Sequence, residues 1–260
     1  AGGNTSIGTK VQGAVKCRQL TLANAHNVTI ESGGSVTVTS SVVTTANTAK
    51  IVVEAGRTGS GALIANNAGN NGETLPTVRL EKTTERLNQN SVREWTLLGI
   101  PVDGWTSTNI QSSTAANGSK EAIGHFDNST GQWVTYNADA GTALTPGKGY
   151  HASPDDSGDN VIPMEGTLVD EGFMQTTIND QAGTHGNWNL IGNPYPAYMR
   201  LNDQDTGDSN SATDDFLSDN AGNIHNTYEA IYSWDGEQYV PHNYAGSGKN
   251  YVAPGEGFFV

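Results

Sequence analysis

Acidic and amide side chains crowd into residues 202–226, where they could coordinate a cation. Calcium binds six to eight oxygen ligands at about 2.3 to 2.6 Å, and carboxylates at alternate positions supply such ligands well. The order Gly207-Asp208 reverses the usual acidic residue and glycine of a calcium loop, so a solvated acidic loop is the alternative interpretation. The candidate calcium ligands are Asp203, Asp205, Asp208 and Asn210. The cluster at 155–159 is a weaker candidate.

Aromatic side chains offer a second kind of binding chemistry, because sugar rings stack their apolar faces on exposed indole and phenol rings. The candidate glycan-binding residues are Trp105, Tyr195, Tyr198, Trp234, Tyr239 and Tyr244. By contrast, Trp95, Trp133 and Trp188 recur at equivalent or near-equivalent strand positions, so we expect them in the core.

Catalytic motifs are not found in the sequence. The six histidines are scattered, with no two-histidine, one-glutamate zinc motif and no Gly-x-Ser-x-Gly elbow. Cys17 is the only cysteine, so it forms no disulfide within the chain. The acidic residues lie mostly in polar loops, which would not fix two carboxylates at a catalytic separation. We therefore expect a protein that is not an enzyme.

The net charge of -14 would repel a phosphate backbone, so a nucleic acid is not an expected partner. The chain contains no run of about 18 apolar residues, so we expect no membrane span. The 32 glycines, with many Asn, Ser and Thr residues, favour short strands joined by tight turns. The predicted fold is all-β.

Residues 86–260 contain an internal duplication, with copies at about 93–165 and 186–260. The segment 95–101 (WTLLGIP) returns as 188–194 (WNLIGNP), and 144–150 (LTPGKGY) returns as 252–258 (VAPGEGF). Between them, a hairpin around Asp127 is matched by one around Asp235. This order of blocks predicts a duplicated β-sandwich-like module, and residues 202–226 lie where the second copy is longer.

Residues 1–85 form a different predicted domain. Apolar residues alternate with period two between Gln19 and Leu80, in short runs separated by glycine turns. This pattern predicts a β-solenoid-like segment, with a sandwich of short hairpins as the alternative. An open solenoid end permits self-association. The sequence also ends inside an apparent strand, which makes Phe258, Phe259 and Val260 candidate assembly residues.

Three stretches resemble type IX secretion substrates, a group that includes cell-surface adhesins: 186–196 (GNWNLIGNPYP), 231–236 (IYSWDG) and 254–260 (PGEGFFV). The resemblance implies export to the outer cell surface or the medium. Together with the solenoid-like start, the apparent final strand and the missing catalytic motifs, the resemblance predicts a non-catalytic structural or adhesive protein. We expect it to associate with itself, as filaments, or with other surface proteins. The alternative is a carbohydrate-binding module of a secreted polysaccharide-processing protein.

Overall fold

The computed structural model of the protein describes residues 8–23, 26–45, 48–56, 58–65, 74–84, 95–110, 113–114, 116–137, 140–154, 160–169, 178, 187–202, 215–225, 229–245 and 251–260. Strands and turns make up nearly all of this part of the chain, which confirms the all-β prediction. Its helices are the four-residue α1 (Ser107–Ile110) and α2 (Phe216–Asp219). Neither helix has the length or apolar character needed to cross a bilayer.

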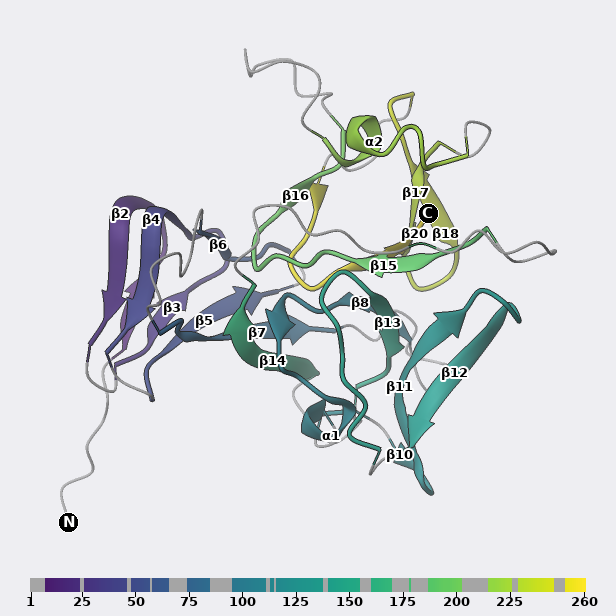
Figure 1. Ribbon diagram of the computed structural model, residues 1–260, viewed down its shortest axis with the longest axis horizontal. Coiled ribbons are helices and arrows are strands. Elements are labelled where there is room, and N and C mark those ends of the chain that lie inside the picture. Colours follow the sequence, from purple (N-terminus) through teal and green to yellow (C-terminus); the bar gives the residue numbers. More distant parts are fainter. Residues whose placement is uncertain are drawn as a thin grey trace.

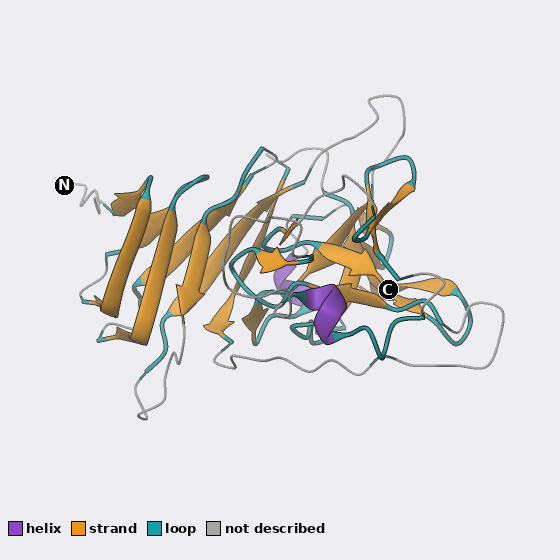
Figure 2. Cartoon of the chain, turned by 90° about the horizontal axis from the view of Figure 1, so that it is seen from above, coloured by secondary structure: helices purple, strands orange, loops and turns teal. Residues whose placement is uncertain are grey.

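The N-terminal strands alternate between two parallel sheets. One sheet contains β1 (Thr9–Val11), β3 (Val28–Ile30), β5 (Lys50–Ala55) and β7 (Thr77–Thr83), and the other contains β2 (Ala14–Leu22), β4 (Ser35–Thr44) and β6 (Ala62–Ala65). Figures 1 and 2 show the N-terminal strands stacked on one side of the molecule and the C-terminal strands on the other side. Their period-two pattern stacks apolar residues in register along the sheet, as in the row Val11, Ile30, Val53 and Leu80.

Two later strands extend the β7 end of the first sheet. β14 (Val161–Leu168) pairs antiparallel with β7, and β9 (Val102–Asp103) pairs antiparallel with β14. Met164 lies opposite Leu80 and continues its buried row. One hydrophobic cluster therefore runs from Leu22 to Leu168, across the domain boundary that the sequence analysis placed after residue 85.

Two further antiparallel sheets share one strand order. The β11 sheet runs β12 (Gln132–Asn137), β11 (Lys120–Asp127), β13 (Gly149–Ala152) and β8 (Thr96–Gly99), with β10 (Ala116–Asn117) also paired to β11. The β17 sheet runs β18 (Tyr239–His242), β17 (Ile231–Trp234), β20 (Gly257–Phe259) and β15 (Leu190–Gly192). β16 (Met199–Arg200) pairs with β19 (Tyr251–Val252) beside them.

The strand register also matches between the two sheets. Leu97 pairs with His151 on β13, as Leu190 pairs with Phe259 on β20. In the outer hairpins, the pair Phe126 and Trp133 corresponds to the pair Trp234 and Tyr239.

The β11 and β17 sheets meet through reciprocal backbone contacts. The Gly99 amide donates to the Gly255 carbonyl at 3.1 Å, and the Gly192 amide donates to the Gly147 carbonyl at 3.1 Å. Exchanging equivalent positions converts one contact into the other, which is the property of an isologous, approximately twofold interface. Glycines permit this approach, because a Cβ atom at Gly192 would lie 2.4 Å from Gly99 Cα.

The last strand corrects the expectation that the sequence ends in an unpaired strand. β20 pairs with β15 on one side and β17 on the other. Phe258 and Phe259 are buried, and Val260 exchanges backbone hydrogen bonds with Asn189. In this structure Phe258, Phe259 and Val260 are core and sheet residues, and offer no free strand edge.

Candidate ligand-binding groove

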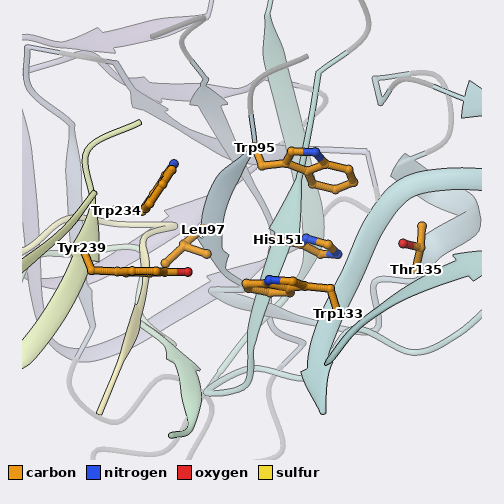
Figure 3. Close-up of a pocket in the computed structure, with 7 residues that line it drawn as sticks. All are labelled: Trp95, Leu97, Trp133, Thr135, His151, Trp234 and Tyr239. Atoms are coloured by element: carbon orange, nitrogen blue, oxygen red, sulfur yellow. The ribbon is translucent and has the colours of Figure 1, made fainter. Parts of the chain in front are cut away.

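Three rings from the β11 sheet form a stack. Trp95 immediately precedes β8, His151 lies on β13 and Trp133 lies on β12. The imidazole centroid is 4.2 Å from each indole, with interplanar angles of 18° to Trp95 and 14° to Trp133. Figure 3 shows the imidazole between the two indoles. Gly124 lies across from His151, and a Cβ atom there would come within 2.6 Å of His151 Nε2.

His151 is an uncharged group in this stack. Its exposed fraction is 6%, and burial, with a smaller contribution from the nearby His125, lowers its pKa to about 4. Its Nε2 atom has no hydrogen-bond partner within the part of the chain that the structure describes. At neutral pH the ring therefore acts as a flat, neutral surface.

The β17 sheet carries aromatic rings at the three equivalent positions, Trp188, Phe259 and Tyr239. The ring centroids of Trp188 and Phe259 are 6.4 Å apart, and those of Tyr239 and Phe259 are 5.4 Å apart, both edge to face. Phenylalanine thus replaces histidine as the central ring, and stacking is replaced by edge-to-face packing.

The two sets of rings meet across the sheet interface. Phe259 packs edge to face on Phe126 at 5.2 Å and on Trp133 at 5.9 Å. Two neighbouring cavities open beside them. The first, of about 380 Å³, is lined by Trp95, Leu97, Trp133, Thr135, His151, Trp234 and Tyr239. The second, of about 440 Å³, is lined by Phe126, Trp133, Trp188, Tyr232, Tyr239 and Phe259.

We call the two cavities together the aromatic groove. Three of its rings have wide exposed surfaces: Trp95 at 37%, Trp133 at 39% and Tyr239 at 45%. None of the described lining residues carries a formal charge at neutral pH, because His151 is neutral there. The groove is suited to a neutral ligand with flat apolar faces.

Residues 3–260 match a family model described as a domain of unknown function (DUF8693). The chain belongs to this family. Among curated proteins and among solved structures, no significant match to the chain was found.

The structure brings two of the six predicted glycan-binding residues into the groove, Trp234 and Tyr239. Figure 3 shows them on the other side of Leu97 from His151. Trp105 is only 4% exposed and packs in the core, so its ring offers no face to a ligand.

The other three predicted residues lie outside both cavities. The Tyr198 hydroxyl accepts a hydrogen bond from the Ser60 amide at 2.8 Å, which ties it to the N-terminal strands. The Tyr244 hydroxyl donates to Asp215 Oδ1 at 2.7 Å, and Tyr195 is half-buried beside Asn193.

The candidate calcium ligands Asp203, Asp205, Asp208 and Asn210 lie outside the described residues, as does the cluster at 155–159. Within the described residues, no group of three or more His, Cys, Asp and Glu side chains is arranged to hold a metal ion.

Trp95 and Trp133 were expected in the core because they recur, but both line the groove. One signal in the sequence pointed the other way. Trp133 in 132–134 (QWV) corresponds to Tyr239 in 238–240 (QYV), so the same strand position was expected in the core in one copy and in a binding site in the other. In the structure Trp133 and Tyr239 are both exposed, and each lines both cavities.

Proposed function

We propose that this protein is a non-catalytic adhesive region of an extracellular or cell-surface protein, and that its aromatic groove binds carbohydrate. The observation that carries the proposal is the set of exposed rings Trp95, Trp133 and Tyr239 around two adjoining cavities. Exposed apolar patches of this kind mark binding sites. Pyranose rings offer the flat CH surfaces that such rings stack against.

The groove's chemistry favours sugar over other ligands. Phosphate-rich ligands are disfavoured by the net charge of -14 and by the uncharged lining of the groove. Catalysis is not part of the proposal, because the histidine of the groove, His151, is held neutral and buried between two indoles.

The wider architecture is part of the same proposal. We take residues 1–85 as a β-solenoid-like segment that projects a duplicated β-sandwich-like module, 86–260. The matching strand orders and registers of the β11 and β17 sheets support the duplication. Export as a type IX secretion substrate rests on the sequence resemblance, and calcium binding at Asp203, Asp205, Asp208 and Asn210 rests on the sequence alone.

The direct test is a glycan array probed with the purified protein, with calcium and with chelator. We expect binding that the double substitution Trp133→Ala with Tyr239→Ala abolishes. The matched control is Tyr251→Ala, because Tyr251 is an exposed aromatic residue that lines neither cavity. Failure to bind any glycan, or equal loss in the control, would refute the proposal.

Self-assembly is a second candidate function, favoured by an exposed apolar residue on β2, the outermost strand of one parallel sheet. Val15 stacks in register on Val36 and Leu63 but is 45% exposed, whereas the other two are buried. A strand of a second copy would bury Val15 and pair with β2. Light scattering and electron microscopy test this. Assemblies that Val15→Lys abolishes support it, and uniformly monomeric particles contradict it.

A further inference from the structure

We infer that the aromatic groove holds two sugar units of one neutral polysaccharide chain, one in each of two adjoining subsites related by the approximate twofold axis. This inference rests on the proposed carbohydrate-binding function and deepens it, because it specifies the ligand's charge class and its minimum length.

The two cavities are built from equivalent positions. Trp95 in the first corresponds to Trp188 in the second, and His151 corresponds to Phe259. Each cavity also takes two rings from the opposite sheet: Trp234 and Tyr239 line the first, and the equivalent Phe126 and Trp133 line the second. Exchanging the sheets thus converts the five matched rings of one cavity into those of the other, whereas Leu97, Thr135 and Tyr232 have no counterpart in the opposite lining.

Trp133 and Tyr239 line both cavities, and they occupy equivalent positions on β12 and β18. A ligand in either cavity therefore contacts the same two rings. Adjoining cavities with shared walls suit neighbouring units of one chain better than two independent ligands, since linked units pay the entropic cost of association once.

The spacing of the subsites is fixed by backbone packing. The glycine contacts between the sheets leave no room for a Cβ atom at Gly99, Gly149, Gly192 or Gly257. Because closely packed backbones resist deformation, the two cavities form a preorganised pair.

The two subsites differ in their polar groups. The polar side chains Thr135 and His151 line only the first cavity, whereas the apolar Phe126 and Phe259, with Tyr232 as the one added hydroxyl, line only the second. We therefore expect the first to accept a more polar edge of the sugar ring and the second to cover an apolar face.

The lining also selects the ligand's charge. A uronate or sulfate group entering the groove would lose hydration without gaining a cation among the described lining residues. The net charge of -14 adds long-range repulsion. Neutral polysaccharides are the class that meets neither penalty.

Affinity electrophoresis with chemically matched polymers tests the charge class. The pairs are agarose against the sulfated galactan carrageenan, and mannan against the uronate polymer alginate. We expect retardation by at least one neutral polymer and by neither acidic one. Preference for an acidic polymer would overturn this inference while leaving carbohydrate binding intact. No binding by any polymer or by any glycan on the array would overturn the proposed function as well.

Calorimetry with one to six units of the neutral sugar that binds tests the two subsites. We expect affinity to rise at least tenfold from one unit to two or three. Trp95→Ala and Trp188→Ala should each weaken binding of the longer sugars about tenfold, and Trp133→Ala should weaken it more. If Trp188→Ala impairs folding, Trp188→Leu keeps apolar packing without the ring. Full affinity for a single unit, or dependence on Trp95 alone, would overturn the two-subsite arrangement.

Discussion

His151 shows how neighbouring rings set the charge of a single residue. Both faces of its imidazole are covered by indole, so water has little access to the charged form. The same position in the β17 sheet holds Phe259, which never carries a charge. The first subsite therefore contains a histidine that behaves as an aromatic ring at neutral pH and that charges only when the solution is acidic.

Stability should consequently depend on pH through His151. Its pKa is about 4 in the folded protein, against 6.5 ordinarily. Between these values the unfolded chain binds a proton that the folded protein excludes, so the free energy of unfolding falls as pH falls from 6.5 to 4. The full loss is about 3 kcal/mol at about 1.4 kcal/mol per pKa unit. Urea unfolding at several pH values measures it.

His151→Phe is the matched variant, because phenylalanine occupies the equivalent position in the second sheet. Its free energy of unfolding should depend much less on pH between 6.5 and 4. Part of the dependence of the free energy of unfolding on pH should remain, since burial also lowers the pKa of His125. Identical slopes in wild type and variant would contradict this account of His151.

Asn193 has an equally specific role in the backbone. It is fully buried, and its Nδ2 lies 2.8 Å from the Ala197 carbonyl, 3.2 Å from that of Val252 and 3.1 Å from that of Ala253. Its Oδ1 accepts from the Tyr195 amide at 3.0 Å. The Asn of the Gly-Asn-Pro motif thus joins the turn after β15 to the turn before β20.

Asn193→Ala should lower the free energy of unfolding by about 3 kcal/mol, because it leaves several buried backbone groups without partners. Thermal and urea unfolding measure the change. The control is Asn137→Ala at an exposed position on β12, where a change within about 0.5 kcal/mol is expected. Similar decreases in the free energy of unfolding for both variants would show that the buried hydrogen bonds of Asn193 do not stabilise the fold.

At this scale the sequence predicted only part of the groove. Trp234 and Tyr239 were identified because they are aromatic residues near polar loops. Trp95 and Trp133 were not, because recurrence in two copies has the same sequence signature for a core residue and for a repeated binding residue. Only the meeting of the two sheets shows which faces remain exposed, and that contact is not encoded in either strand's own pattern.

Among the elements, the glycines between the sheets decide how closely β8 and β15 approach. A Cβ atom at Gly192 would lie 2.4 Å from Gly99 Cα and 3.0 Å from the Lys148 carbonyl oxygen. These are backbone atoms, which cannot rotate away as a flexible side chain can. Both sheets would have to move apart, and the groove between their outer strands would widen.

Gly192→Ala should therefore destabilise the protein by about 3 kcal/mol, at the upper end of the usual cost of overpacking. It should also weaken carbohydrate binding without altering any ring. Gly222→Ala is the control, since within the described part of the chain no atom beyond its two sequence neighbours lies within 4 Å of the position where its Cβ would be. Scanning calorimetry compares the two. A tolerated Gly192→Ala would mean that the sheets are not tightly packed.

The elements themselves were largely predictable. Period-two alternation predicted the N-terminal strands, and the repeated blocks predicted that β8, β11, β12 and β13 would have counterparts in β15, β17, β18 and β20. The pairing of β14 with β7 was not predictable, because it joins strands separated by more than 70 positions through side chains that would suit many partners. The expected free end at β20 was wrong for the same reason, since its partners lie far away in sequence.

For the whole molecule, the N-terminal strands and the C-terminal sheets are held together by several contacts. The Leu63 amide donates to the Pro196 carbonyl at 2.7 Å. Gly255 packs so closely on Leu80 that a Cβ atom there would lie 2.6 Å from Leu80 Cδ2. With the hydrophobic cluster that continues from Leu22 to Leu168, these contacts favour unfolding as one unit, although the sequence suggested two domains.

The positions of the tryptophans allow a test of that cooperativity, because all five lie at or after Trp95 and the N-terminal strands have none. Far-ultraviolet circular dichroism reports on all strands, whereas tryptophan fluorescence reports only on the later sheets. We expect the two urea transitions to coincide.

Leu80→Ala removes a fully buried side chain from β7. It should lower the free energy of unfolding by about 2 to 5 kcal/mol as measured by either probe, so both transitions should move together to lower urea concentration. Ile64→Ala, at an exposed position on β6, should shift neither by more than about 1 kcal/mol. An early dichroism transition that Leu80→Ala moves alone would show that the N-terminal strands unfold independently. In that case the strands would act as a separate spacer, whereas coincident transitions mean that they stabilise the sheets that carry the groove.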